Sequence, residues 1–349
     1  MNIDVLNDIA VRMVTPGKGI LAADESTGTI KKRFDTIDVP STDETRRDYR
    51  EMLFRSDMAM RDHISGVILF DETLRQKAAD GTPLVTLIEA AGAIPGIKVD
   101  AGAKPLTGFP GETVTEGLDG LRDRLADYHK LGARFAKWRA VIDIGKEDGA
   151  CGTYQVPTRY CISANARALA RYAALCQDAG IVPIVEPEVL MDGDHDIDRC
   201  FEVTHATLTA LYAALYEARV VLEGTILKPN MVIAGKKAAR QASTEEIAEK
   251  TVRCFRATVP AAVPGIVFLS GGQSEHDATE NLNTINAGYQ GQLPWKISFS
   301  YGRALQAGAL QAWRGKPENR AAGAAAFAHR ARMNGLAQKG QWSASLENA

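Results

Sequence analysis

The stretch IVPIVEPE (Ile181–Glu188) places two glutamates at the end of a run that is otherwise almost entirely apolar. An apolar run without polar alternation predicts a strand that is buried on both faces, as in a parallel sheet covered by helices. Seven further runs of this kind occur along the chain: Gly19–Asp24, Ser65–Phe70, Gly96–Asp100, Arg134–Ile142, Gly224–Pro229, Gly265–Gly271 and Lys296–Gly302. The chain is therefore expected to contain a parallel sheet of eight strands.

Segments with helical periodicity separate these runs. Ser41 with Glu44, and Ser243 with Glu246, have the spacing of capping boxes, which predicts helices over Thr42–Asp62 and Thr244–Val259. Eight strand–helix units of roughly 44 residues predict a single-domain α/β fold, the (β/α)8 TIM barrel, over residues 1–349. Two further apolar stripes have helical spacing: Leu118, Leu121, Leu125 and Tyr128, and Phe201, His205, Leu208, Tyr212 and Leu215. Irregular structure is expected in the loop 143–160 and in a polar tail from about residue 335.

The composition is that of an ordinary globular protein, with 349 residues, 45% hydrophobic, and a formal net charge of -2. A net charge so close to zero argues against nucleic acid or an anionic membrane as a partner. Asp4 and Asp8 occur where a secretory signal would have basic residues, and no run is long enough to span a membrane. The five cysteines include no C-x-x-C pair and indicate reduced thiols, so we expect a cytoplasmic protein.

Ionisable or polar residues occur at or near the ends of the predicted strands. In a TIM barrel the active site lies at the carboxyl ends of the strands. Any one such residue could be a salt-bridged rim residue, but charged groups placed repeatedly at this end of buried strands favour convergence on a site. The residues concerned are Asp24, Lys98, Asp100, Lys137, Arg139, Glu186, Glu188, Lys228, Ser270 and Arg303.

Lys228 is the strongest candidate nucleophile, because GTILKPN contains a single lysine at the end of an apolar strand. Poor solvation and a second cation such as Lys137 disfavour a charged ammonium group and favour the nucleophilic amine. An amine nucleophile implies a carbonyl substrate and an iminium intermediate. Glu186 and Glu188 point to one face of their strand and are candidate proton donors. The alternative is a strand-end lysine that extends into solvent.

Two glycine-containing turns follow the last two predicted strands: Leu269–Gln273 (LSGGQ) and Ser300–Arg303 (SYGR). The corresponding loops of TIM barrels commonly bind phosphate, and Arg303 would add a bidentate donor. LSGGQ also resembles the signature of ATP-binding-cassette ATPases, but no G-x-x-x-x-G-K-[ST] motif accompanies it, and no G-x-G-x-x-G motif opens a helix. The two turns are therefore interpreted as a binding site for a phosphorylated small molecule.

Metal-ligand spacing is weak in this sequence. The six histidines are scattered without an H-x-x-H or H-E-x-x-H pattern. The segment Gly193–Asp196 (GDHD) has the composition of a metal-binding loop, but it fits a polar turn that leads into a helix at Asp196 better. No metal and no cofactor are expected.

Eight motifs, in order and with nearly colinear spacing, resemble those of class I fructose-1,6-bisphosphate aldolase, the metal-independent Schiff-base type. The motifs are KGILAADEST, GVILFDETL, GIKVD, FAKWR, IVPIVEPE, EGTILKPNM, FLSGGQS and FSYGRALQ, and the likeness extends from about Val11 to about Gly340. The resemblance implies a (β/α)8 barrel, usually a homotetramer. It also implies reversible cleavage of fructose 1,6-bisphosphate to dihydroxyacetone phosphate and glyceraldehyde 3-phosphate, in glycolysis and gluconeogenesis.

The resemblance also implies roles for individual residues. Lys228 would form the Schiff base, Glu186 would be the acid/base with Glu188 in support, Lys137 and Arg139 would lie beside them, and Asp24 would act at the C4 hydroxyl. The C1 phosphate would meet the two glycine turns, at Ser270, Gly271, Ser300, Gly302 and Arg303. The second phosphate would meet Ser26, Thr29 and Lys98, with Lys32 and Arg33 close in sequence.

Two features depart from the family pattern. The loop 145–160, which contains Cys151, is longer than expected. Many family members end in a tyrosine that reaches the active site, whereas the stretch Lys339–Ala349 contains no tyrosine. A transaldolase-like Schiff-base barrel and a non-catalytic phosphate-binding barrel remain as alternatives, and the preference between fructose 1,6-bisphosphate and fructose 1-phosphate stays open.

Overall fold

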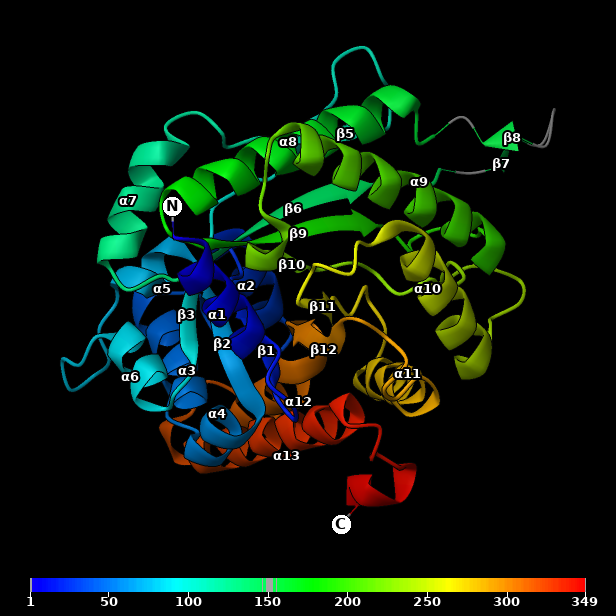
Figure 1. Cartoon of the computed structure of the whole chain (residues 1–349). Helices are drawn as coiled ribbons and strands as arrows, with labels where there is room; N and C mark the ends of the chain where they lie inside the picture. Colours follow the sequence, from blue (N-terminus) through cyan, green and yellow to red (C-terminus); the bar gives the residue numbers. More distant parts are fainter. Residues whose placement is uncertain (1, 146, 149–152, 155, 349) are drawn as a thin grey trace.

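Eight parallel strands close into a barrel at the centre of the molecule, and helices surround it (Figure 1). The computed structural model describes residues 2–145, 147–148, 153–154 and 156–348. The strands follow one another around the barrel in the order β1 (Gly19–Ala23), β12 (Lys296–Tyr301), β11 (Gly265–Phe268), β10 (Ile226–Leu227), β9 (Val182–Val189), β6 (Phe135–Ile142), β3 (Ile94–Lys98) and β2 (Ile64–Leu69). The predicted (β/α)8 barrel and its eight strands are confirmed.

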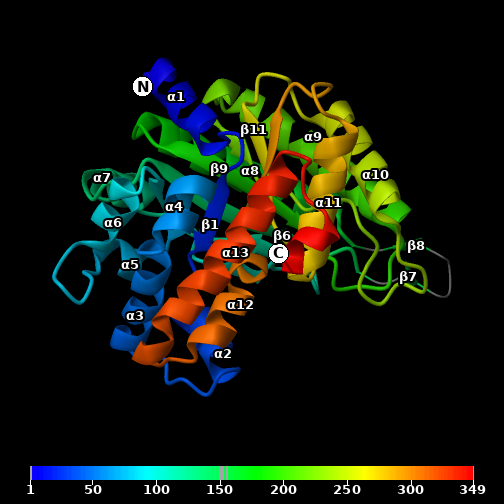
Figure 2. The ribbon, with the colours of Figure 1, turned by 90° about the horizontal axis from the view of Figure 1, so that it is seen from below.

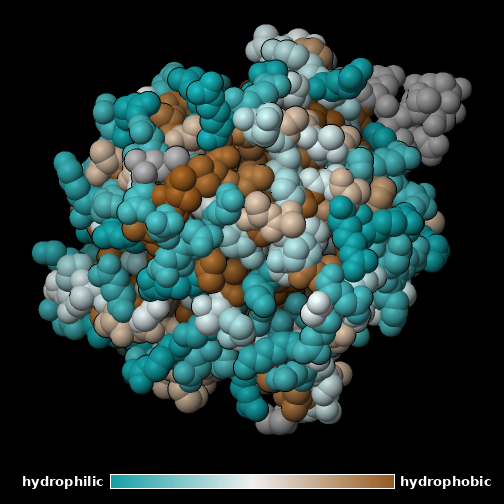
Figure 3. Space-filling view, in the orientation of Figure 1, coloured by the Kyte–Doolittle hydropathy of each residue, from teal (hydrophilic) through white to brown (hydrophobic). Residues whose placement is uncertain are grey.

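The helices lie on the outside of this barrel and cover its strands. They are α1 (Ile3–Met13), α2 (Thr27–Asp35), α3 (Asp43–Phe54), α4 (Asp57–His63), α5 (Asp71–Arg75), α6 (Leu84–Ala90), α7 (Leu121–Lys130), α8 (Arg159–Asp178), α9 (Ile197–Glu217), α10 (Thr244–Thr258), α11 (Glu275–Gly288), α12 (Arg303–Trp313) and α13 (Arg320–Gln338). Short 3-10 helices occur at η1 (Leu222–Gly224), η2 (Pro317–Asn319) and η3 (Ala344–Asn348). Hydrophilic residues dominate the periphery of the face in Figure 3, as expected for an outer helical layer.

The amino-terminal end of the barrel is filled by apolar side chains. Leu6 and Met13 of α1 form one buried cluster with strand residues such as Phe135 and Val267, so α1 closes this end. The close packing also explains a glycine inside a strand, because a Cβ on Gly96 would lie 2.2 Å from the Phe135 ring. The buried charged residues of the strands, Lys137, Glu186 and Glu188, lie toward the opposite, carboxyl end.

The strand predicted over Gly224–Pro229 is much shorter in the structure. Only Ile226–Leu227 is strand, because Leu222–Gly224 forms a 3-10 turn and Pro229 has no N–H to donate to a neighbouring strand. The backbone N–H of Lys228 still donates to the Val185 carbonyl at 2.8 Å, which keeps Lys228 in register beside β9.

The helix predicted over Thr42–Asp62 is wrong as a single element. It is divided into α3 and α4, because Ser56 adopts non-helical angles and its hydroxyl donates to the Ala324 carbonyl of α13 at 3.3 Å. The capping box also differs from the predicted pair, since Thr42 and Thr45 form it one residue later. At the other predicted box, Ser243 does cap α10, accepting a hydrogen bond from the Glu246 N–H at 3.2 Å.

The two regions expected to be irregular are partly ordered. In the loop 143–160, β7 (Glu147–Asp148) pairs with β8 (Thr153–Tyr154), while Cys151 lies outside the described residues. A second hairpin not anticipated from the sequence joins β4 (Ala103–Pro105) to β5 (Thr113–Thr115).

The carboxyl-terminal segment is ordered by a buried ion pair. Helix α13 continues to Gln338, past the expected start of the tail near residue 335. In Figure 2 the end of the chain lies beside α11 and α13. Both Glu347 carboxylate oxygens accept hydrogen bonds from Arg330 at 2.8 Å, and the Trp342 indole N–H donates to the same carboxylate at 2.9 Å.

None of the described helices is both long and apolar enough to cross a lipid bilayer.

Candidate active site

A cavity of about 1380 Å³ opens at the carboxyl ends of the barrel strands. Every site residue proposed from the sequence lines this cavity, whether it comes from a strand end, a glycine turn or the start of α2. The predicted convergence is therefore observed: residues far apart in the sequence share one wall because the strands are parallel and their carboxyl ends meet on one side.

A single carboxylate, Glu186, lies between two buried lysines. Lys228 Nζ lies 3.3 Å from Glu186 Oε1, and Lys137 Nζ lies 3.3 Å from Glu186 Oε2. Lys137 Nζ also contacts Asp24 Oδ2 at 2.8 Å. Since β2 and β3 separate β1 from β6, this last contact crosses the barrel interior. Two carboxyl groups and two amino groups thus alternate in a largely buried cluster, where each polar group has a partner of opposite character.

The charges in this group fix one another's ionisation. Burial alone would raise the pKa of Asp24, but the positive charges of Lys137 and Lys228 lower that pKa to about 2. Burial would likewise lower the pKa of Lys137, and the negative charges of Asp24 and Glu186 outweigh it and raise that pKa. Asp24 is therefore a carboxylate and Lys137 an ammonium group at neutral pH.

A second set of paired charges lies beside the first. Arg139 Nε donates to Glu188 Oε2, and the ion pair raises the pKa of Arg139 against the effect of burial. Lys98 Nζ donates to Asp100 Oδ1 at 2.6 Å and to the Asp100 carbonyl at 2.8 Å. Asp100 also accepts from the Arg139 backbone N–H at 3.3 Å, which connects β3 to β6 at their ends. These contacts hold Arg139 and Lys98 in fixed positions on the cavity wall.

The two glycine turns form a cationic corner of the cavity. Gly271 and Gly272 have φ angles of 55° and 80°, a conformation that glycine adopts without strain. The Ser300 hydroxyl is buried and has no hydrogen-bond partner in the described part of the chain. An Arg33 guanidinium nitrogen lies 3.4 Å from where a Cβ of Gly302 would be, so Arg33 faces the same corner. A hydroxyl and guanidinium groups around glycine backbone suit an anionic group such as phosphate.

The residues proposed for a second phosphate begin helix α2. Ser26 is the N-cap of α2, accepts from the Thr29 N–H at 3.4 Å and shares a hydrogen bond with the Thr29 hydroxyl at 3.1 Å. Lys32 follows on the next turn and also lines the cavity. This helix start presents hydroxyls and unpaired N–H groups to the cavity.

A polar network that the sequence pattern does not predict lies behind Asp24. The side chain of Glu25 is buried and pairs with Arg33, and the Gln306 amide donates to Glu25 Oε1 at 3.0 Å. Arg50, which is 1% exposed, donates to the Glu25 backbone carbonyl at 2.9 Å. The chain is therefore anchored at the residue after Asp24, which fixes the direction of the Asp24 side chain.

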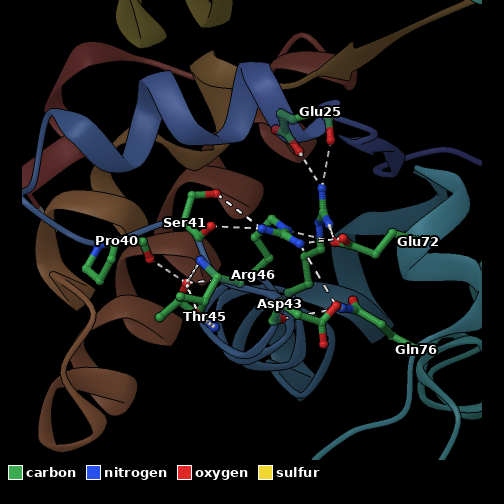
Figure 4. A network of polar contacts seen from close by, with 10 residues as sticks. Glu25, Pro40, Ser41, Asp43, Thr45, Arg46, Glu72 and Gln76 are labelled. Carbon is green, nitrogen blue, oxygen red and sulfur yellow. Dashed lines mark hydrogen bonds and ion pairs between the residues drawn. The ribbon is translucent and has the colours of Figure 1, made fainter.

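Figure 4 shows how this network continues onto α3 and α5. Arg46 makes a bidentate contact with Glu72, with N–O distances of 2.8 and 2.5 Å, and donates to the Ser41 carbonyl at 3.0 Å. Arg50 reaches the same Glu72 carboxylate at 3.4 Å. In the sequence, Arg46 and Arg50 are spaced four residues apart on the same helix face as the apolar Tyr49 and Leu53. This spacing could have indicated two buried arginines, but it does not identify the carboxylates that pair with them.

Metal-ligand geometry is not found among the described residues, where no group of three or more His, Cys, Asp or Glu side chains is placed to hold a metal ion. Within Gly193–Asp196, the Asp196 side chain caps α9, so the prediction of a polar turn leading into a helix is confirmed.

Comparison with known proteins decides which kind of barrel this is. The family described as fructose-bisphosphate aldolase class-I matches residues 5–349. The chain belongs to the class I fructose-bisphosphate aldolase family. It is 57% identical over 343 residues to a probable fructose-bisphosphate aldolase class 1 of Xanthomonas campestris pv. campestris, with 98% of this chain and 99% of that protein covered. It is 54% identical over 340 residues to fructose-bisphosphate aldolase C of Mus musculus, covering 97% and 91% of the two chains.

A solved fructose-bisphosphate aldolase has the same fold. The fructose-bisphosphate aldolase of Plasmodium falciparum, in complex with TRAP and a small molecule inhibitor, is 49% identical and superimposes with a TM-score of 0.92, covering 98% of this chain and 96% of that chain. As a member of this aldolase family the chain is a lyase, and the transaldolase-like and non-catalytic alternatives are set aside.

Proposed function

We propose that this aldolase cleaves fructose 1,6-bisphosphate reversibly into dihydroxyacetone phosphate and glyceraldehyde 3-phosphate through a Schiff base on Lys228, without a metal, in glycolysis and gluconeogenesis. The contact of one carboxylate, Glu186, with both Lys228 and Lys137 carries the proposal. It puts a proton carrier within reach of the amine that has to gain and lose protons during imine formation.

The first half of the reaction forms the imine. Lys228 gives one proton to Glu186, and its neutral amine adds to the C2 ketone; a second proton moves from the nitrogen to the C2 oxygen and gives a carbinolamine. Glu186 then delivers a proton to the C2 hydroxyl, water leaves, and the nitrogen lone pair forms the C=N bond of a cationic iminium. Lys137 stays charged beside Glu186 and stabilises the negative charge that develops on oxygen.

The second half breaks the C3–C4 bond. The bond electrons move into the iminium and form an enamine, while Asp24 takes the proton of the C4 hydroxyl and the C4 aldehyde leaves. Glu186, or a water held by it, returns a proton to C3 of the enamine, and water hydrolyses the resulting iminium to release dihydroxyacetone phosphate and free Lys228. Lys137 contacts both Asp24 and Glu186, so the proton that Asp24 takes from the C4 hydroxyl can be passed through Lys137 to Glu186.

Two anion-binding sites support a bisphosphate substrate. The corner formed by Ser270, Gly271, Gly302 and Arg303 is proposed to hold the C1 phosphate. The start of α2, at Ser26 and Thr29, is proposed to hold the other phosphate, with Lys98 nearby. A cavity of about 1380 Å³ is ample for a sugar bisphosphate.

Reductive trapping tests this function. Sodium borohydride added with dihydroxyacetone phosphate is expected to inactivate the enzyme and to modify a single peptide that contains Lys228. Lys228→Met is expected to abolish both cleavage and trapping, while EDTA leaves the wild type active. Modification of another lysine, or loss of wild-type activity on chelation, would contradict the proposal.

A further inference from the structure

We propose that Lys236 is an additional phosphate-binding residue of the C1-phosphate corner, and that Asp192 is its counter-ion while the corner is empty. The inference rests on the proposed function, because it takes the phosphate of dihydroxyacetone phosphate as the ligand. Lys236 belongs to the loop that follows β10, the strand that leads to Lys228.

The Lys236 ammonium group faces the glycine turn. A Cβ placed on Gly272 would lie 2.6 Å from Lys236 Nζ, 2.9 Å from Lys236 Cε and 3.3 Å from an Arg303 guanidinium nitrogen. The Lys236 and Arg303 charges therefore lie within about 6 Å of each other, on the same side of this turn. Two cations at this separation repel each other and favour an anion between them.

The backbone around Lys236 is held in place, so its side chain is presented from a fixed position. The Lys236 N–H donates to the Met191 carbonyl at 2.8 Å, and the Lys237 N–H donates to the Gly193 carbonyl at 2.9 Å. These bonds tie the loop after β10 to the loop after β9. The Met191 sulfur in turn lies 3.6 Å from where a Cβ of Gly271 would be, so both loops approach the phosphate turn.

The present partner of Lys236 is a weak competitor. Lys236 Nζ contacts Asp192 Oδ1 at 2.7 Å, with side chains 42% and 62% exposed, and exposed pairs of this kind contribute little free energy. A phosphate dianion held by Arg303 and the backbone N–H groups of the turn carries more negative charge than one carboxylate and is therefore the stronger partner for a second cation. Phosphate is therefore expected to replace Asp192 as the partner of Lys236.

Measured in the condensation direction, the reaction has two substrates, dihydroxyacetone phosphate and glyceraldehyde 3-phosphate, and each carries one phosphate. The KM of each substrate therefore reports on one of the two phosphate sites. Lys236→Met is expected to raise KM for dihydroxyacetone phosphate roughly threefold to tenfold, with KM for glyceraldehyde 3-phosphate unchanged. Lys237→Met removes the same charge from the neighbouring position and serves as the matched control, with no change in either KM. Asp192→Asn removes the competing anion and is expected to lower KM for dihydroxyacetone phosphate.

Equal KM values for dihydroxyacetone phosphate in the Lys236→Met and Lys237→Met variants would overturn the inference. So would a rise in KM for both dihydroxyacetone phosphate and glyceraldehyde 3-phosphate in Lys236→Met. A rise in KM for dihydroxyacetone phosphate in Asp192→Asn would also overturn it, because it would show that the ion pair only supports the loop. Arg303→Ala measured in parallel separates this failure from that of the proposed function. If Arg303→Ala also leaves KM for dihydroxyacetone phosphate unchanged, the whole phosphate corner is misplaced. Calorimetric titration with inorganic phosphate gives the same ranking without turnover.

Discussion

Lys137→Met tests whether the buried charges at the centre of the site stabilise the folded state. The substitution removes a cation that lies 2.8 Å from Asp24 and 3.3 Å from Glu186, and it leaves Asp24 buried without its nearest partner. Against the effect of burial, the positive charges around Asp24, that of Lys137 foremost, lower its pKa from 3.8 to about 2 in the folded protein, and at about 1.4 kcal/mol per pKa unit this corresponds to roughly 2 to 3 kcal/mol. We expect a loss of unfolding free energy of about 2 to 3 kcal/mol at pH 7.

The pH dependence of this loss has a defined sign. Because the pKa of Asp24 is lowered by folding, its contribution is fully present above the ordinary value of 3.8 and is lost as the pH falls through about 2. The difference in stability between wild type and Lys137→Met is therefore expected to be largest near neutral pH and to shrink below pH 3.8. Urea unfolding followed by tryptophan fluorescence at a series of pH values measures it.

Lys31→Met provides the matched control. Lys31 contacts Asp35 at the same distance of 2.8 Å, but the two side chains are 62% and 53% exposed, so its removal is expected to cost at most about 1 kcal/mol. Equal losses for the two variants, or a loss for Lys137→Met that stays constant down to pH 2, would refute the argument.

Three further predictions concern the phosphate corner, the assembly and the tail. Arg303→Ala is expected to weaken phosphate binding by about 1.5 to 3 kcal/mol, seen as a rise of roughly 10-fold to 150-fold in KM for fructose 1,6-bisphosphate, and an unchanged KM would place the phosphate elsewhere. The chain is expected to be a homotetramer, and a monomer mass by light scattering at micromolar concentration would refute this. Removal of Gln341–Ala349 is expected to leave kcat for cleavage nearly unchanged, because this segment has no tyrosine and Glu347 binds it to Arg330. The same removal should lower stability, since it separates the buried Arg330 from Glu347. A large drop in deuterium exchange at C3 of dihydroxyacetone phosphate on truncation would show that the tail takes part in proton transfer.

The sequence determined the barrel and the membership of the site. A run such as Ile181–Glu188 is apolar on both faces, and this local property requires a covered parallel strand wherever it occurs. Eight such runs, each followed by helical periodicity, leave few other arrangements. Strand ends in a parallel barrel meet on one side, so the ionisable residues at those ends, Lys228 and Asp24 among them, could be assigned to one cavity without coordinates.

Helix limits and loop order were less accessible from the sequence. The break at Ser56 depends on a hydrogen bond to α13, a helix more than 250 residues later, and no local signal encodes that contact. The order of the tail depends in the same way on Arg330 and Glu347, which are brought together only by the packing of α13. A polar segment is normally expected to be exposed, because charged side chains are rarely buried. The tail is an exception because Glu347 finds a buried partner that only the folded structure supplies.

Only the tertiary structure decided which charges meet. Spacing places Lys137, Glu186 and Lys228 at strand ends, but the barrel's closure and register decide that Glu186 lies between the two lysines and that Lys137 reaches Asp24 across the interior. The buried network of Glu25 and Arg50, and the approach of Lys236 to Gly272, likewise join segments that the sequence keeps apart. The periodicity of apolar residues predicts which side of a strand or helix is buried, because burial depends on many neighbours together and on no single one of them. A pairwise electrostatic contact depends on the distance between two particular atoms, which is fixed only when the whole barrel has closed.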